Sequence, residues 1–195
     1  MKIFDLYETD NIVVNDPGLK RVVTLTPKFV LKSHGRAKGD FSKTKVNIVE
    51  RLANLVAVPG HRSKKHKIMV GRSSGKYNKH MKAVLEAFKI IEKKTNLNPV
   101  QVLVTAVEKA SPREEVTTIE YGGAKYPQAV DCSPSRRIAL TLRLIVHGAQ
   151  DKAFGKKNKI QETLANEIIL ASQESNDSAA VSKKNEMEKQ ANSAR

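Results

Sequence analysis

The chain has 195 residues, which predicts one domain with appendages, and its net charge of +15 points to a polyanionic partner. Tryptophan is absent and aromatic residues make up 5%, so the core must be built from aliphatic side chains. A single cysteine excludes an internal disulfide and a cysteine-rich zinc site, and neither a membrane span nor a secretory signal is visible, so a cytoplasmic protein without membrane contact is expected.

Residues 1–43 show short apolar runs that prolines and glycines interrupt, and no helical period survives there. We predict an extended, basic N-terminal arm over these residues, which must lie on another surface to be ordered, and a single helical domain over residues 44–195. Residues 19–82 hold 17 lysines and arginines against only Asp40 and Glu50. This concentration of one charge sign in a third of the chain is the pattern expected of a nucleic-acid-binding protein.

The helical domain shows apolar residues that recur every three or four positions, with charged residues between them. Such spacing is typical of amphipathic helices that bury one face. It predicts about six helices, whose apolar stripes cover residues 49–56, 81–91, 100–107, 138–149, 160–171 and 181–194. The last stripe is thin, so the last helix is expected to be the weakest.

Several of these helices begin with recognisable capping residues. Asn98 and Ser133 each precede a proline, which fits the first helical position because no N–H is needed there. Gln101 is expected to return a capping bond to Asn98. Asn158 and Asp177 are the predicted caps of the last two helices.

Residues 115–131 break the helical period and predict a β-hairpin. Strand-forming residues lie on both sides of Gly122 and Gly123, which supply the positive φ angles of a tight turn. A two-stranded ribbon is not stable alone, so it either packs on the helices or projects toward a partner. We expect the tip to be a contact device in which Tyr121 and Tyr126 are free to stack on an exposed base; the alternative is that both rings pack back on the helices.

The segment from Gly71 to Lys76 superficially suggests a phosphate-binding P-loop. That motif needs four residues between its glycines and a serine or threonine after the lysine, whereas here three residues separate Gly71 from Gly75, and Tyr77 follows. We therefore expect a basic loop suited to RNA phosphates. Nucleotide hydrolysis remains a disfavoured alternative.

Other catalytic or metal-binding arrangements are not evident. His61 and His66 lie within a cluster of cations that would repel a metal ion, so no metal site is expected. The adjacent carboxylates Glu114 and Glu115 point to opposite sides of an extended strand and do not form an acid–base pair. The chain is accordingly expected to be neither an enzyme nor a cofactor-binding protein.

Arg136, Arg143 and His147 are seven and four residues apart and therefore share one face of the predicted helix, with Arg137 beside that face. The planar guanidinium group suits bidentate phosphate binding, so this stripe is a candidate for contact with a nucleic-acid backbone. From spacing alone, an ordinary solvent-exposed face remains equally open.

Several motifs, in one order along the chain, resemble those of the universal small-subunit ribosomal protein seven family in its archaeal form. They cover residues 45–52, 98–103, 111–116, 121–123, 129–137, 164–169 and 193–195. The arm segment 33–36 is also similar to archaeal and eukaryotic members, because bacterial members have a shorter leader.

This resemblance implies a helical bundle with a protruding hairpin that binds the 3′ major domain of small-subunit rRNA. It implies a structural role in the head of the small ribosomal subunit, where the protein organises head assembly and its hairpin lies near the exit-site tRNA and the mRNA path. The expected partners are that rRNA, neighbouring head proteins, mRNA and tRNA, with no homo-oligomer. A free-standing RNA-binding regulator is the alternative.

The resemblance also assigns candidate RNA contacts, and the charge pattern extends them. Matching motif positions give Lys43, Lys45, Lys76, Lys79, Lys125, Arg136, Arg137 and Arg143. Charge adds Arg36, Lys38, Arg62, Lys64, Lys65 and Lys67. The candidate exit-site contacts at the hairpin tip are Tyr121, Gly122, Gly123 and Tyr126.

Overall fold

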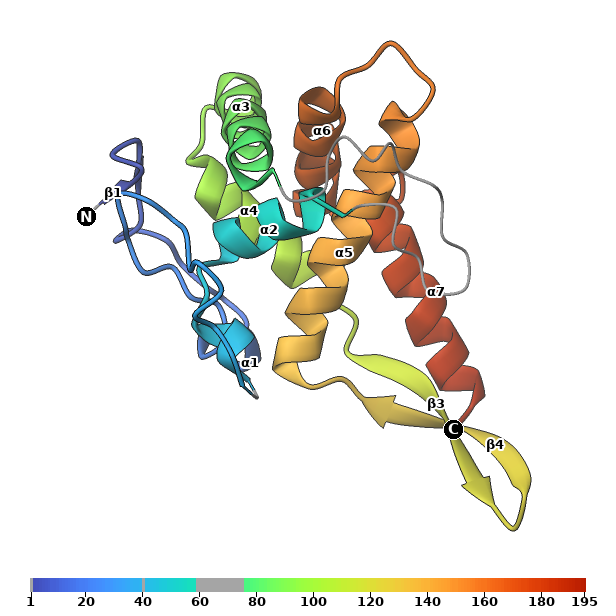
Figure 1. Cartoon of the computed structure of the whole chain (residues 1–195). Coiled ribbons are helices and arrows are strands. Elements are labelled where there is room, and N and C mark those ends of the chain that lie inside the picture. Colours follow the sequence, from blue (N-terminus) through green and yellow to red (C-terminus); the bar gives the residue numbers. More distant parts are fainter. Residues whose placement is uncertain (1, 40, 59–75) are drawn as a thin grey trace.

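The computed structural model describes residues 2–39, 41–58 and 76–195, which form a mainly helical chain (Figure 1). The short elements are β1 (Lys2–Ile3), β2 (Tyr7–Glu8), α1 (Pro17–Lys20) and the 3-10 helix η1 (Ser42–Lys45). The long ones are α2 (Ile48–Val56), α3 (Tyr77–Thr95), α4 (Pro99–Ala110), β3 (Glu114–Tyr121), β4 (Ala124–Asp131), α5 (Pro134–Ala153), α6 (Ile160–Ser172) and α7 (Ala179–Ser193). The predicted fold class, a helical bundle with one hairpin, is confirmed.

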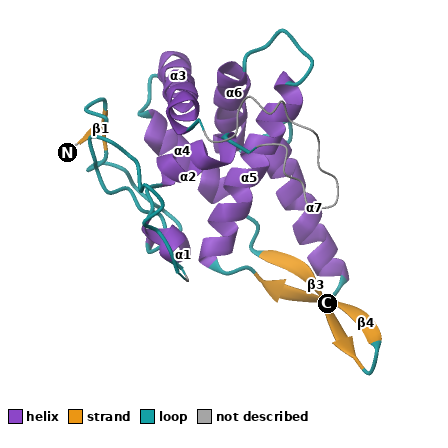
Figure 2. Cartoon of the chain, viewed as in Figure 1, coloured by secondary structure: helices purple, strands orange, loops and turns teal. Residues whose placement is uncertain are grey.

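The six predicted helices correspond to α2–α7, and Figure 2 shows how they group together. The additional helix α1 was not predicted, because the arm carries no helical period. Its single turn is built locally: the Asp16 carboxylate accepts a hydrogen bond from the Gly18 N–H at 2.8 Å, and Pro17 occupies the first helical position. A side-chain cap and a proline are therefore enough for one turn without an amphipathic pattern.

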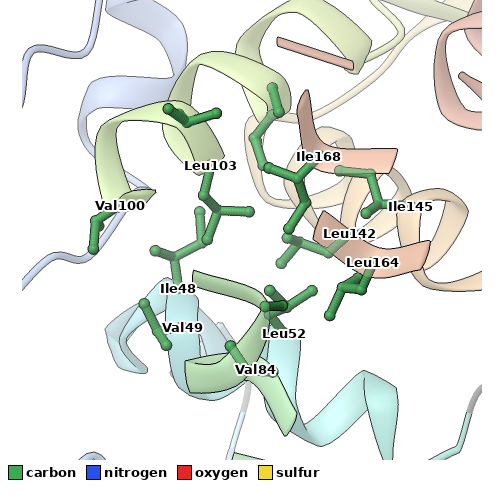
Figure 3. Packing of buried hydrophobic residues seen from close by; sticks show 14 of the residues in the cluster. Ile48, Val49, Leu52, Val84, Val100, Leu103, Leu142, Ile145, Leu164 and Ile168 are labelled. Carbon is green, nitrogen blue, oxygen red and sulfur yellow. The ribbon is translucent and has the colours of Figure 1, made fainter. Parts of the chain in front are cut away.

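The core is an aliphatic cluster with α6 at its centre. Helix α6 packs against α3, α4 and α5, which bury its Leu164 and Ile168. Figure 3 shows Leu52, Leu103 and Leu142 converging on the same region from α2, α4 and α5. Burial of each such side chain contributes about 1.5–3 kcal/mol, so this cluster holds the helices together. No described helix combines the length and apolar character needed to cross a bilayer.

The start of α4 anchors the arm in a way that the capping prediction missed. Asn98 caps the helix as expected, accepting from the Val100 N–H at 3.0 Å. Gln101, however, does not return a bond to Asn98. Its amide instead brackets Val13, accepting from the Val13 N–H at 2.9 Å and donating to the Val13 carbonyl at 3.0 Å. The predicted capping box is wrong because the arm backbone offers Gln101 a donor and an acceptor together.

The arm lies along the helices rather than projecting from them (Figure 1). Leu19 and Leu31 are buried in the same apolar cluster as the helical residues. The Glu108 carboxylate of α4 accepts hydrogen bonds from the backbone N–H groups of Asn15 and Asp16 at 2.6 and 3.0 Å. The surface that orders the arm is thus the protein's own bundle.

The hairpin is paired over its whole length, from Glu114 opposite Asp131 to Tyr121 opposite Ala124. Gly122 and Gly123 form the connecting turn with φ angles of +59° and +81°, as predicted. Helix α7 contacts the hairpin at its base, and the Arg195 side chain pairs with Glu114. The distal half projects away from the bundle (Figure 2).

The caps of the last two helices differ by one residue from the prediction. Helix α6 begins after Lys159 rather than Asn158, and α7 begins after Ser178 rather than Asp177. The Ser178 hydroxyl accepts from the Val181 N–H at 3.4 Å and donates to the buried Glu167 carboxylate at 2.8 Å. Because Ser178 serves both the cap and a buried acceptor, it is favoured over the neighbouring aspartate.

Candidate nucleic-acid interface

The predicted RNA-contact cations occupy different parts of the surface. Arg62, Lys64, Lys65 and Lys67 lie outside the described residues, as do His61, His66 and the Gly71–Gly75 loop. Of the remaining cations, all but Arg137 are exposed: Arg36, Lys38, Lys43, Lys45, Lys76, Lys79, Lys125, Arg136 and Arg143.

A basic groove lies between the arm and the N-terminal end of α5. It has a volume of about 430 Å³, and we call it the α5 groove; its described lining residues are Gly39, Phe41, Lys43, Thr44, Arg51, Ser135, Arg136 and Ala139. Three of these carry positive charge and none is acidic. The groove therefore combines two predicted contact cations, Lys43 and Arg136, with one that the sequence did not single out, Arg51.

A second groove is lined by other residues of the same arm segment. This arm groove, of about 290 Å³, includes Arg36, Lys38 and Lys45 among its lining residues, with Glu50 as its acidic member. The Glu50 carboxylate accepts from the Ser33 N–H at 2.6 Å, so it is already engaged in holding the arm. Residues 37–39 and 41–45 thus line two grooves, and we call these residues the ridge.

The ridge is fixed by hydrogen bonds to the rest of the arm and to α2. The Thr24 hydroxyl donates to the Thr44 carbonyl at 2.5 Å, and the Asn47 amide donates to the Thr26 carbonyl at 3.0 Å. The Ile48 N–H donates to the Thr24 carbonyl at 3.0 Å. These contacts hold Lys43 and Lys45 on a defined backbone before any partner arrives, which reduces the entropic cost of binding.

Arg136 and Arg137 are adjacent in sequence but have different surroundings. Arg136 is exposed and lies in a bidentate pair with Glu115, whose hydrogen bond raises the pKa of the Arg136 guanidinium. Arg137 is buried and donates to the Asp16 carboxylate at 2.7 Å and the Ser111 hydroxyl at 2.9 Å. The geometry gives Arg137 the role of tying α1 to α5, while Arg136 and Arg143 remain on the surface.

Cys132, near Glu115 and Arg136, carries a buried free thiol. Burial, with the Glu115 charge nearby, raises the pKa of Cys132 to about 11, so it is protonated at neutral pH. Within the described ranges no three histidine, cysteine or acidic side chains gather in a way that would hold a metal ion. Because Cys132 is buried, its role is in packing.

Lys79 lines a third and larger cavity of about 700 Å³ near the start of α3, together with Lys82, His80 and Glu86. Lys76 precedes the helix and is exposed.

At the hairpin tip, the exposed fractions of Tyr121 and Tyr126 are 81% and 59%, so neither ring packs on the helices. The tip is free to meet a partner.

Comparison with known proteins gives one consistent result. The family model described as "Ribosomal protein S7p/S5e" matches residues 19–195. The chain is 46% identical to "Small ribosomal subunit protein uS7" of Nanoarchaeum equitans, over 100% of this chain and 99% of the relative. It is 47% identical to the proteins of that name from Methanothermobacter thermautotrophicus, over 98% of both chains, and Archaeoglobus fulgidus, over 99% of this chain and 94% of the relative.

Proposed function

The chain belongs to the ribosomal protein S7p/S5e family, and from that membership we propose that it binds the 3′ major domain of small-subunit rRNA and helps organise the head of the subunit. As a family member it is a structural component of the small ribosomal subunit and not an enzyme. The proposal concerns which RNA it contacts and with which residues.

The observation that carries this proposal is that the ridge, residues 37–39 and 41–45, lines two grooves rich in lysine and arginine. Its Lys43 lines the α5 groove together with Arg136, and the exposed Arg143 lies two turns further along α5. Lysine and arginine side chains on a preformed surface suit the phosphate backbone, because neutralising phosphates releases their condensed counterions. Lys76, Lys79 and Lys125 extend the proposed contact set along α3 and the hairpin.

The hairpin is proposed to reach the exit-site tRNA and the mRNA path. Its support is geometric: the tip projects from the bundle, and Tyr121, Tyr126 and Lys125 are all exposed there. Two exposed rings beside a cation offer stacking and charge together to a single-stranded segment or a tRNA loop. Neighbouring head proteins are the remaining proposed partners.

The alternative is a free-standing regulator that binds RNA away from the ribosome. Sedimentation separates the two readings: a subunit component co-sediments with small subunits in high salt, whereas a regulator stays near the top of the gradient. Binding to a transcript of the 3′ major domain, with a transcript of the 5′ domain as control, then tests the proposed rRNA site. Equal affinity for both transcripts would contradict it.

A further inference from the structure

Arg51 is a half-buried cation of α2 that lines the α5 groove. Its Nη1 atom is buried and has no hydrogen-bond partner in the part of the chain that the structure describes. Burial lowers the pKa of its guanidinium, which is the sign of a desolvated cation. A buried donor without an acceptor destabilises a fold, and a bound ligand that supplies an acceptor to the Arg51 guanidinium removes this cost.

The groove around Arg51 supplies further groups for an anion. Lys43 lines it, as does Arg136, part of whose guanidinium pairs with Glu115. Ser135 and Arg136 are in the first turn of α5. The N–H groups of a first helical turn lack intrahelical acceptors and favour negative charge. The Ser133 side chain makes no capping bond to them, and the first turn holds no acidic residue. The start of α5, the Arg51 side chain and two further cations thus line one groove.

Phe41 adds an apolar surface beside these cations. Phe41 is 80% exposed. Its backbone is in the left-handed region, with a φ of +58°. The turn is fixed by the Phe41 carbonyl, which accepts from the Thr44 hydroxyl at 2.6 Å and the Thr44 N–H at 3.0 Å. An exposed ring on a rigid turn at the rim of a cationic groove is suited to stacking on a base.

We propose that the α5 groove is a dedicated site for one backbone phosphate of RNA, held by Arg51, Lys43 and Arg136, while Phe41 stacks on an adjacent base. The inference rests on the proposed function, because it names a contact within the same interface. It goes beyond that function by assigning a ligand to Arg51 and a base contact to Phe41. In this site Arg51 binds through its guanidinium fork, which a lysine does not reproduce.

The test compares the unchanged full chain with Arg51→Met, Arg51→Lys and Phe41→Asn, and Lys89→Met on the exposed face of α3 is the charge-matched control for Arg51→Met. The first readout is the melting temperature in inorganic phosphate and in chloride at equal ionic strength. Phosphate should raise the melting temperature of the unchanged chain and Lys89→Met, but not that of Arg51→Met. In chloride, Arg51→Met should melt at the same temperature or higher, because an unpaired buried donor is removed. A large drop there would show that Arg51 is structural and would overturn the proposal.

The second readout is affinity for the 3′ major domain transcript as a function of salt. Arg51→Met should bind about tenfold more weakly or worse and lose about 0.7–0.9 of the log–log salt slope, since one phosphate contact is gone. Arg51→Lys should keep the slope and lose part of the affinity. Phe41→Asn, whose side chain tolerates the left-handed backbone, should weaken binding about fivefold or more without changing the slope.

The outcomes separate this inference from the function on which it rests. If the unchanged chain binds the transcript and Arg51→Met binds it equally with the same slope, the phosphate site is wrong and the rRNA function stands. If the unchanged chain does not bind the transcript but phosphate stabilises it through Arg51, the anion site stands and the rRNA function fails. Loss of both effects would overturn both.

Discussion

Lys152 of α5 and Glu167 of α6 form an ion pair at 2.7 Å in which the Glu167 side chain is completely buried. The other Glu167 oxygen accepts from the Ser178 hydroxyl at 2.8 Å and from the Ala180 N–H at 3.3 Å. Lys152 also donates to the Asp177 carbonyl at 3.0 Å. One buried carboxylate therefore joins α5 and α6 to the start of α7, which explains how a helix with so thin an apolar face is held.

We predict that Glu167→Ala destabilises the protein by about 1–3 kcal/mol, because it leaves the buried Ser178 hydroxyl and the Ala180 N–H without their acceptor. The matched control is Glu186→Ala, which breaks the exposed pair with Lys183 and should cost about 1 kcal/mol or less. Urea unfolding of both variants measures the difference. Equal, small losses would show that the buried carboxylate does not hold α7.

The Asp16–Arg137 pair predicts an acid-sensitive arm. Burial would raise the pKa of Asp16, but the hydrogen bond and charge of Arg137 and the Gly18 N–H outweigh it and lower that pKa. A carboxyl whose pKa is lower in the folded state contributes stability above its unfolded pKa of about 3.9, and this stability is lost as pH falls through the folded value. The free energy of unfolding should therefore fall less steeply with acid in Asp16→Asn than in the unchanged chain below about pH 4. Identical pH profiles would contradict the assignment.

The surface arginines of α5 should matter for RNA and little for folding. We predict that Arg136→Ala with Arg143→Ala weakens binding to the 3′ major domain transcript, because two proposed phosphate contacts are lost, and lowers stability by about 1 kcal/mol or less. Lys89→Ala with Lys93→Ala on α3 removes the same charge elsewhere and is the control. A sharp fall in melting temperature would instead mean that the Arg136–Glu115 pair is structural.

The hairpin tip should be dispensable for folding. Replacing Glu120–Lys125 by Asn-Gly joins Ile119 to Tyr126, which are already opposite each other, so the remaining register and the net charge are kept. We predict native helical circular dichroism and normal entry into small subunits, with altered exit-site tRNA binding. Tyr121→Ser with Tyr126→Ser, which keeps the ribbon length, should reproduce the tRNA effect if the rings carry it. A variant that does not fold would place the tip in the core.

The helices and hairpin could be predicted from the sequence because each depends on spacing within a short stretch. The docking of the arm could not be predicted in this way: Leu19 and Leu31 become buried through contacts with distant residues, such as the bond between Val13 and Gln101, 88 positions apart. Local propensity carries no information about such a partner, and the same long-range contact diverted Gln101 from the predicted capping bond.

The sequence predicted those interface residues whose exposure follows from their charge alone. Lys43, Lys45 and Arg136 are exposed, as expected because burying an unpaired charge is costly. Arg137, one residue from Arg136, points inward and pairs with Asp16. Because Asp16 is 121 positions away in sequence, local spacing did not predict this pair. Arg51 was missed for the opposite reason, since a single charge beside an apolar stripe looks like an ordinary helix surface. Only its buried, unpartnered nitrogen in the structure distinguishes it.

The most direct test of rRNA binding through the ridge and its two grooves is the affinity of the unchanged chain for the 3′ major domain transcript across a salt series. The 5′ domain transcript is measured in parallel as the control. Binding that neutralises several phosphates should give a steep fall in affinity, with about 0.7–0.9 of log–log slope for each contact, and tighter binding to the 3′ major domain at every salt concentration. A slope near zero, or equal affinity for the two transcripts, would contradict the account.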